Sequence, residues 1–421
     1  MKNEMLAATM LALFAAPVCA GTHALLPAQA GDLVPATLSA STTVAAPTAR
    51  SAGSPVVRAP MPRRERRPVS INWALPHDQP VQSEPTPFAP SSREYWIDVS
   101  ATELQRGVAL PLSAPGAVIR LSPGDPQGGR LDASGVRLRL GRQALNLQQA
   151  SSTLADAASL QAAGMAVPEA SMVFKLKAEL GSGLATLQAP AASGRYVVHV
   201  LEPQSEFSVA ATGERSELLA GQQMHVRVAM RANDKAAPLV AVGGFLRSPD
   251  GSTTTLAYRQ QADGNFTTSV RPPVASSTPG LWEVHSFSAG LDAEGHEVRR
   301  DTTTVFAVAA PTARFSGTAS TARASDRGID IALAVDTARA GRYAASAVLY
   351  GRAADGRMVP AAFAQSAAVL RAGSGRLVLH FGPASLSGVG APYDLRDLRL
   401  QDQSALSLVE RQAVALRFDA P

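Results

Sequence analysis

The residues that come nearest to a catalytic motif are His296 and Glu297. A zinc-protease helix needs a second histidine one helical turn later, but Arg300 stands at that position. The segment also runs from a glycine-containing loop into a strand pattern, so a helical metal site is not expected. No Gly-x-Ser-x-Gly elbow and no phosphate-binding loop occur in the sequence. We therefore predict that the protein is not an enzyme, with no catalytic residue and no cofactor.

Oxygen ligands for calcium could come from the loop at residues 290–295. Asp292 and Glu294 lie in this loop and Asp301 follows it, and carboxylates at the rim of a β-sandwich are ligands that calcium prefers. An ordinary turn uses the same Asp and Gly residues. We predict a turn without a metal, and calcium at Asp292 and Glu294 is the alternative.

Tryptophan and histidine side chains are the remaining candidates for ligand contacts. Trp96 and Trp282 could stack on sugar rings if exposed, but their strand neighbours predict burial in the core. The strand histidines alternate with apolar residues, which predicts solvent-facing positions and not metal ligands. These histidines are His199, His225, His285 and His380.

A short aromatic segment stands out among residues 31–90, which are otherwise rich in Pro, Ala, Ser and Thr. Ile71, Trp73 and Leu75 are predicted to add a strand to the edge of the first domain or to a partner, the alternative being an accidental apolar patch. The run at residues 63–67, Arg-Arg-Glu-Arg-Arg, is interpreted as a solvated charge run. A processing site and a contact with an anionic surface are its functional alternatives.

The N-terminal 20 residues have the pattern of a secretory signal peptide. Lys2 precedes an apolar run of about 14 residues, which is too short to span a membrane. Val18 and Ala20 suit the −3 and −1 positions of a cleavage site, and Ala28 and Ala30 offer a second one. Cleavage at either site removes Cys19, the only cysteine. We predict an exported protein, periplasmic or extracellular, with no disulfide and no integral membrane segment.

The Pro-, Ala-, Ser- and Thr-rich composition of residues 21–90 predicts a disordered linker. A stretch of this composition buries too little apolar surface to offset its ordering entropy. Residues 91–421 hold 32 basic and 29 acidic residues, so their net charge is only +3. That balance excludes nucleic-acid binding by electrostatics. The chain is 46% hydrophobic but only 5% aromatic, which predicts cores of Ala, Val and Leu.

From residue 91 onward, short alternating runs separated by turn residues indicate an all-β fold of three β-sandwiches, with boundaries at 91–205, 206–310 and 311–421. One possible helix is predicted in the first block, at residues 151–163, with an extended connection as the alternative. Strands of the first block are predicted at residues 95–99, 117–121, 136–140, 172–177 and 196–201.

The second block is the most regular of the three. Residues 224–230 alternate apolar and polar side chains, and turns follow at Pro249-Asp250-Gly251 and Asp263-Gly264. About seven short strands over about 100 residues are typical of an immunoglobulin-like sandwich, although no Cys-Trp-Cys spacing is present. The block resembles immunoglobulin-like modules of bacterial surface proteins that carry the phrase P-D-G followed by D-G-x-[FY]-T.

The third block, with its turn at Asp355-Gly356 and its runs at 340–351, 370–381 and 390–400, resembles accessory β-sandwich modules of secreted bacterial proteins. As a whole, residues 91–421 resemble a secreted Gram-negative family of unknown function built from tandem immunoglobulin-like domains. This resemblance covers about three-quarters of the chain and implies a fold, but no catalytic residue.

The function predicted from these features is binding to a protein or glycan surface, through loops at a sandwich end, by an exported protein. An accessory or cryptic hydrolase with a site between domains is the alternative from another class, and a structural spacer is a third. Converging Asp, Glu or His side chains in a cleft would favour the hydrolase.

Overall fold

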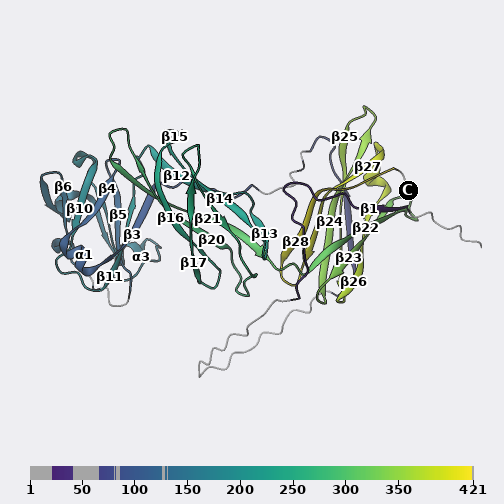
Figure 1. Ribbon diagram of the computed structural model, residues 1–421, viewed down its shortest axis with the longest axis horizontal. Helices are drawn as coiled ribbons and strands as arrows, with labels where there is room; N and C mark the ends of the chain where they lie inside the picture. The colour runs from purple at the N-terminus through teal and green to yellow at the C-terminus, as the bar shows by residue number, and fades with distance from the viewer. Residues whose placement is uncertain are drawn as a thin grey trace, which may run out of the picture. The chain divides into compact units, whose positions relative to one another are not determined.

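The computed structural model describes residues 21–40, 66–79, 81, 86–125, 129 and 131–419 (Figure 1). The chain forms two compact units, one of Met1–Glu84 with Ala309–Pro421 and the other of Pro85–Val308. The predicted signal peptide and Cys19 lie outside the described residues. The described chain is nearly all β, as predicted, and its strands form antiparallel sheets that pair into three sandwiches.

The first sandwich opens the Pro85–Val308 unit, and its core is a cluster of buried Leu, Val, Ala, Tyr and Phe side chains. The predicted strands at 95–99, 117–121, 136–140, 172–177 and 196–201 are confirmed within one or two residues. Its four-stranded sheet has the order β4 (Val108–Leu112), β10 (Gly183–Gln188), β6 (Arg137–Leu140), β7 (Gln143–Asn146). Its five-stranded sheet has the order β3 (Glu94–Ser100), β11 (Arg195–Leu201), β5 (Val118–Pro123), β9 (Met172–Leu176), β8 (Ser151–Asp156).

The helix predicted at 151–163 is wrong in its first half. Residues Ser151–Asp156 form strand β8, which pairs with β9, and only Ala157–Ala162 form helix α3. The Asp156 carboxylate accepts a hydrogen bond from the backbone N–H of Ser159, so this residue caps the helix where it begins. The other helices of the described chain are also short: α1 (Ala101–Arg106), α2 (Leu147–Ala150) and the 3-10 turns η1 (Ala133–Gly135), η2 (Ala178–Leu180) and η3 (Pro383–Leu386).

The second sandwich completes the same unit. In β14, Met224, Val226, Val228 and Met230 are buried while His225 and Arg227 are exposed, as the alternation predicted. One sheet has the order β12 (Phe207–Gly213), β14 (Met224–Ala232), β19 (Phe266–Val270), β18 (Tyr258–Gln260), with β15 (Lys235–Ala237) beside β14. The other has the order β13 (Glu217–Leu219), β21 (Glu297–Ala309), β20 (Trp282–Leu291), β16 (Leu239–Arg247), β17 (Thr253–Leu256).

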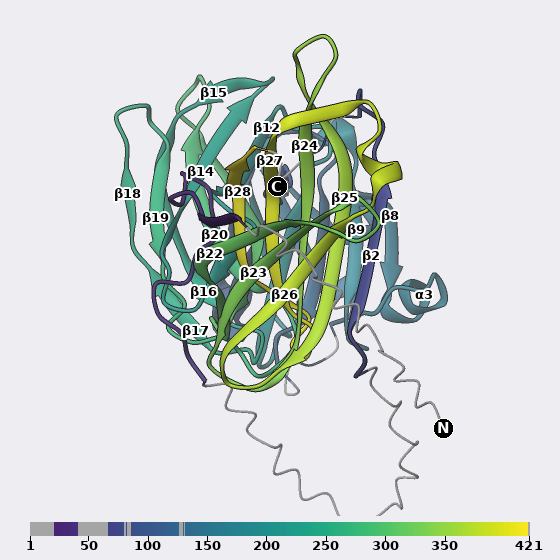
Figure 2. The same ribbon diagram turned by 90° about the vertical axis from the view of Figure 1, so that its right-hand side faces the viewer.

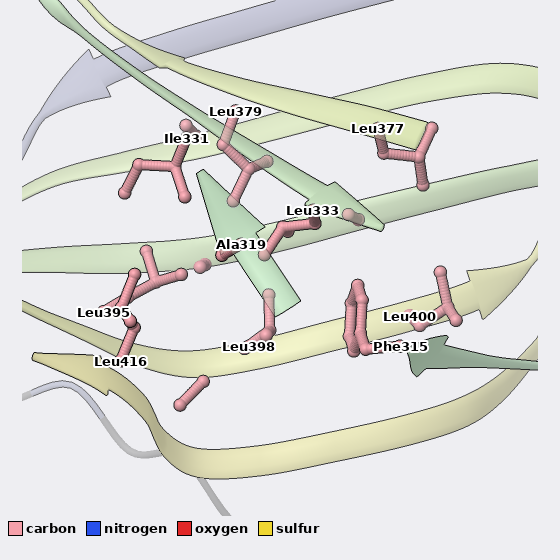
Figure 3. Packing of buried hydrophobic residues seen from close by; sticks show 14 of the residues in the cluster. Phe315, Ala319, Ile331, Leu333, Leu377, Leu379, Leu395, Leu398, Leu400 and Leu416 are labelled. Atoms are coloured by element: carbon pink, nitrogen blue, oxygen red, sulfur yellow. The ribbon is translucent and has the colours of Figure 1, made fainter. Parts of the chain in front are cut away.

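The third sandwich forms the other unit, and Ala and Leu dominate its core, as the composition predicted (Figure 3). One sheet has the order β1 (Gly21–Ala24), β22 (Ala313–Arg323), β23 (Ile329–Thr337), β26 (Gly373–Phe381). The other has the order β2 (Val69–Ala74), β25 (Met358–Leu370), β24 (Gly341–Ala353), β27 (Val389–Asp402), β28 (Ser407–Phe418).

The prediction of a disordered linker at residues 21–90 is wrong for the segments 21–40 and 66–79. Strand β1 pairs with β22 (Figure 1), and β2 pairs with β25 (Figure 2), so each forms an edge of one sheet of the third sandwich. Leu33 is also buried, and its backbone bridges that of Arg411. These segments bury apolar surface against partners more than 200 residues away, which local composition does not reveal. Residues 41–65, with most of the Arg-rich run, lie outside the described residues.

Candidate binding pocket between the first two sandwiches

A pocket of about 750 Å³ lies at the junction of the first and second sandwiches, within the Pro85–Val308 unit. Strands β3 and β11 of the first sandwich and strands β16, β20 and β21 of the second supply its walls. Its aromatic and charged side chains include Trp96, Asp98, Phe245, Phe287, Glu297, Arg299 and Asp301.

The hollow arises from small residues on the outer face of the second sandwich. In the β16–β20 pair, Gly243 lies opposite Phe287 and Ala241 lies opposite Ala289. Cross-strand partners share one face of a sheet, so these residues stand together on the side away from the core. Because Gly243 and the two alanines carry little bulk, the face is recessed beside the phenylalanine ring.

Three rings form what we call the aromatic row: Trp96, Phe287 and Phe245. The ring centroids of Trp96 and Phe287 are 6.4 Å apart with planes at 89°, and those of Phe287 and Phe245 are 5.8 Å apart. The row is flanked by His199 beside Trp96 and by His285, which stacks on Phe245 at 4.7 Å. Since the three rings of the row are half-buried, they offer apolar surface to a ligand.

Charged groups surround this apolar surface. Asp98 is exposed on β3, and the Arg299 guanidinium binds the Glu297 carboxylate with N···O distances of 2.9 and 3.2 Å. The hydrogen bond with Glu297 raises the pKa of Arg299. The pocket therefore combines aromatic rings with carboxylate acceptors and a guanidinium donor, which is the mixture found in sites that orient a polar ligand.

Asp301 is a buried acidic residue in the lining of the pocket. Its Oδ2 accepts a hydrogen bond of 2.8 Å from the backbone N–H of Trp96, so the carboxylate ties edge strand β3 to the second sandwich. Burial raises the pKa of Asp301 to about 7, and hydrogen bonds from the backbone of Trp96 and Ser288 offset only part of that rise. The sequence prediction grouped Asp301 with the calcium candidates Asp292 and Glu294. Instead, Asp301 is buried and its carboxylate binds the backbone of Trp96.

The raised pKa of Asp301 predicts a pH-dependent stability. The ordinary pKa of an aspartic acid is about 4. Because the folded state binds this proton more tightly, the contribution of Asp301 to the free energy of unfolding is fully present below pH 4 and is lost as the pH rises through 7. Asp301→Asn keeps an oxygen acceptor but carries no charge. We expect the stability of this variant relative to the parent to rise by about 3–4 kcal/mol from pH 4 to pH 8, because only the parent buries a charge at the higher pH and the cost of burying the amide is the same at both.

Urea unfolding between pH 4 and pH 8 checks this prediction. The matched control is Asp98→Asn, at an exposed carboxylate of the same pocket. A constant difference in unfolding free energy between Asp301→Asn and the parent across this range would contradict it.

The loop at residues 290–295 has the geometry of an ordinary turn. The Asp292 Oδ1 accepts hydrogen bonds from the backbone N–H groups of Glu294 at 3.0 Å and His296 at 2.7 Å. Ligand atoms of Asp292, Glu294 and His296 lie within 4.8 Å of one another. The sequence prediction did not include His296, and these hydrogen bonds account for Asp292 as a turn residue.

The strand histidines have carboxylate partners that sequence reasoning missed. His225 is exposed as predicted, whereas the other three are half-buried. The pairs are His199 with Glu94 at 2.8 Å, His225 with Glu214 at 3.2 Å, His285 with Glu283 at 2.7 Å, and His380 with Asp330 at 2.7 Å. Glu283 precedes His285 by two residues on one strand face, which is a local signal that could have been used.

The two candidate tryptophans differ in their surroundings. Trp282 is buried in the core of the second sandwich, as predicted. Trp96 is half-buried and lines the pocket, so the prediction of core burial is wrong for it. Its ring packs edge-on against Phe287, so this side chain faces the second sandwich and not its own core. Arg300, which occupies the position of the missing zinc-ligand histidine, is fully buried and forms an ion pair with Glu202.

A larger hollow of about 980 Å³ lies on the second sandwich. Serine and threonine side chains of β17 and β19 supply much of its lining, and Trp282 is its single aromatic residue. It lacks the grouped rings and the Arg–Glu pair of the pocket at the junction, which is therefore the stronger candidate for a binding site.

Comparisons with known proteins agree with this architecture. Residues 60–202 match the N-terminal domain, and residues 312–418 the C-terminal domain, of the family described as domain of unknown function DUF4785. The fold is similar to the crystal structure of a DUF4785 family protein from Legionella pneumophila, with 21% identity, a TM-score of 0.66, and coverage of 84% of this chain and 94% of that one.

Two other solved structures show much weaker similarity. A bacterial ice-binding adhesin is 10% identical with a TM-score of 0.20, covering 80% of this chain and 100% of that one. A Salmonella alpha-2-macroglobulin is 11% identical with a TM-score of 0.22, covering 80% and 24%. No curated protein matches the chain. The chain therefore carries the N-terminal and the C-terminal domain of the DUF4785 family.

Proposed function

We propose that this chain is an exported binding protein without catalytic activity, and that it recognises a glycan or protein surface through the pocket at the junction of its first two sandwiches. The aromatic row with its surrounding carboxylates and guanidinium carries the proposal. Sandwich edges and the loops between strands commonly present such sites on a rigid scaffold.

Of the two ligand classes, the lining favours a glycan. A sugar ring has an apolar face, which stacks on aromatic rings such as Trp96 and Phe287, and a rim of hydroxyl groups. Asp98 and Glu297 can accept hydrogen bonds from these hydroxyls, and Arg299 can donate to them. The pocket is also about the size of the sites that enclose small ligands.

Export is supported by the N-terminal sequence pattern, in which Val18 and Ala20 suit the −3 and −1 positions of a cleavage site. Strand β1 begins at Gly21, the first residue after the predicted cleavage position at Ala20. Cleavage after Ala30 would instead remove β1, whose four residues pair with β22. Among the described residues, no helix is long and apolar enough to cross a membrane.

Glycan-array binding followed by calorimetry tests the proposal. We expect Phe287→Ala to weaken the affinity for the retained glycan at least tenfold, because each stacked ring contributes about 0.5–1.5 kcal/mol beyond its buried area. The matched control is Phe88→Ala, since Phe88 is an exposed ring of the same unit that is not in the pocket lining. An array without any specific ligand, or equal weakening by both variants, would count against the proposal.

A hydrolase is the second candidate, because Asp301 has a raised pKa and shares the pocket with Asp98 and Glu297. Binding is favoured over hydrolysis because the Asp301 Oδ2 already accepts the Trp96 N–H and is held as part of the junction. Release of reducing ends from the retained glycan by the parent protein, and its loss in Asp301→Asn, would establish the hydrolase instead.

A further inference from the structure

We propose that the third sandwich docks on a bilayer surface rich in anionic phospholipid through the outer face of its edge strand β2. This goes beyond the function proposed for the pocket, which lies in the other unit. The surface comprises an apolar stripe of Val69, Ile71, Trp73 and Val369 and the arginines at one end of it.

The stripe is an exposed row of large apolar side chains. Val69, Ile71 and Trp73 alternate along β2 and so share one face, with 40%, 43% and 49% of their surfaces exposed. Val69 lies opposite Ala367 on β25, and Val369, two residues further along β25, extends the same face with 51% exposure. Trp73 is held in place by stacking on Phe363 at 4.6 Å.

An apolar row at this position is unusual for a surface that faces water alone. Natural edge strands are commonly protected by charged side chains, by proline or by short length. Here the three outward positions of the edge strand are valine, isoleucine and tryptophan. Contiguous exposed apolar residues mark interaction surfaces, and tryptophan is enriched where proteins meet the headgroup region of membranes.

Four arginines gather at one end of the stripe. Arg66 and Arg67 are exposed and are separated from the start of β2 only by Pro68, and Arg371 is exposed two residues after Val369. Arg342 is the cross-strand partner of Val369 on β24, and its Nη1 donates a 3.0 Å hydrogen bond to the Arg67 carbonyl. Guanidinium groups bind phosphate oxygens in a bidentate geometry, which suits them to phospholipid headgroups.

The combination of the two features identifies the occupant. Binding at a membrane surface is strengthened by the burial of apolar area and by attraction to anionic lipid. The stripe supplies the apolar area, and the arginines supply the attraction. Guanidinium groups form stronger, charge-assisted hydrogen bonds with phosphate than with the hydroxyls of a neutral glycan. Contact with an anionic surface is one alternative for the Arg-rich run at residues 63–67. The positions of Arg66 and Arg67 beside the apolar stripe favour that alternative.

Flotation of the full-length mature chain with vesicles tests the proposal. We expect binding to vesicles of phosphatidylglycerol and phosphatidylcholine, little binding to phosphatidylcholine alone, and a loss of binding at high salt. Arg66→Gln with Arg67→Gln should weaken the partition about 25-fold, since each basic residue near the surface strengthens it about fivefold. Tryptophan emission should shift to shorter wavelength on binding, and Trp73→Phe should abolish the shift.

The apolar half is tested by Val69→Thr with Ile71→Thr, which keeps β-branched residues and hence the strand. We expect at least tenfold weaker binding, with an unchanged thermal midpoint. The matched control is Val240→Thr with Val274→Thr, two exposed valines of the other unit.

Equal binding to neutral and anionic vesicles, no binding to either, or equal effects of the two double threonine variants would overturn the proposal. So would stripe-dependent retention of a protein partner in place of lipid. Failure here is distinguishable from failure of the proposed function, because Phe287→Ala should float with vesicles like the parent. Conversely, the Arg66→Gln and Arg67→Gln chain should keep its glycan affinity.

Discussion

Replacing Arg300 with methionine should lower the free energy of unfolding of the Pro85–Val308 unit by about 3–5 kcal/mol. The side chains of Arg300 and Glu202 are both 0% exposed, and their charged groups lie 2.7 Å apart. Methionine has a similar length but no charge, so the variant leaves the Glu202 carboxylate buried without a cation. An uncompensated buried charge is among the most destabilising changes that one substitution can make.

The contacts of this pair explain why so large an effect is expected. The Glu202 Oε1 accepts hydrogen bonds from the backbone N–H groups of Ser113 and Ala114 at 2.7 and 3.0 Å. The Arg300 Nη2 donates to the hydroxyls of Ser113 and Ser205, and its Nε donates to the Phe207 carbonyl. The network therefore joins the first sandwich, the connecting segment at Ser205 and the second sandwich. Burial lowers the pKa of Arg300, and the Glu202 charge opposes that shift.

Urea denaturation followed by tryptophan fluorescence measures this loss. The matched control is Arg227→Met, because Arg227 also binds a carboxylate, that of Asp263 at 2.7 Å, but both partners are about half exposed. We expect the control to cost less than about 1 kcal/mol. The double variant Glu202→Gln with Arg300→Met should recover part of the loss, since no buried charge remains. A loss below about 1 kcal/mol for Arg300→Met would contradict the role assigned to the network.

Much of the fold could be predicted from the sequence because strands leave a local trace. The alternation at Met224–Ala232 and Arg137–Leu140 reports which side chains face the core, and that information is contained within a few neighbouring residues. The helix prediction for residues 151–163 was wrong in its first half because it relied on local composition alone. The Ala, Leu and Gln content of this segment suits a helix, but pairing with β9 holds its first half as strand β8.

The candidate pocket could not be assembled from the sequence, because its parts come from strands about 200 residues apart. Trp96 and Asp301 were each noted for a different chemistry, a sugar platform and a calcium ligand, and the structure joins them by one hydrogen bond. The alternation along β20 places Phe287 on the face of Glu283 and His285, but it does not show that this face meets the first sandwich. In the sequence, Arg300 is notable only because it occupies the position of the second histidine of a zinc-protease motif. Its ion-pair partner Glu202 lies in the first sandwich.

The N-terminal segments show the limit of reasoning from composition. The apolar residues Ile71 and Trp73 did indicate strand addition, and β2 forms as an added edge strand, but on the third sandwich and not the first. The polar and proline-rich surroundings of Leu33 carry no period, so its burial depends wholly on a sheet that is built much later in the chain. Low local hydrophobicity therefore does not exclude order when a distant sheet edge is open.

Leu33→Ala tests whether this N-terminal segment stabilises the third sandwich. Only 2% of the Leu33 surface is exposed, and its backbone exchanges two hydrogen bonds with Arg411, at 2.9 and 2.8 Å. Removing a fully buried leucine side chain loses its transfer free energy and leaves a cavity. We expect the free energy of unfolding of the unit that contains residues 309–421 to fall by about 2–5 kcal/mol.

The matched control is Leu406→Ala in the same unit, because Leu406 is 92% exposed and its truncation should change the unfolding free energy by less than about 0.5 kcal/mol. Hydrogen exchange should report the same difference locally, with faster exchange at Arg411 in Leu33→Ala alone. If both variants unfold like the parent, residues 21–40 behave as the linker that composition suggests. If only Leu33→Ala is destabilised, a fragment that starts at residue 91 lacks a part of its own third sandwich, and the exposed edges of β22 and β25 make it prone to aggregate.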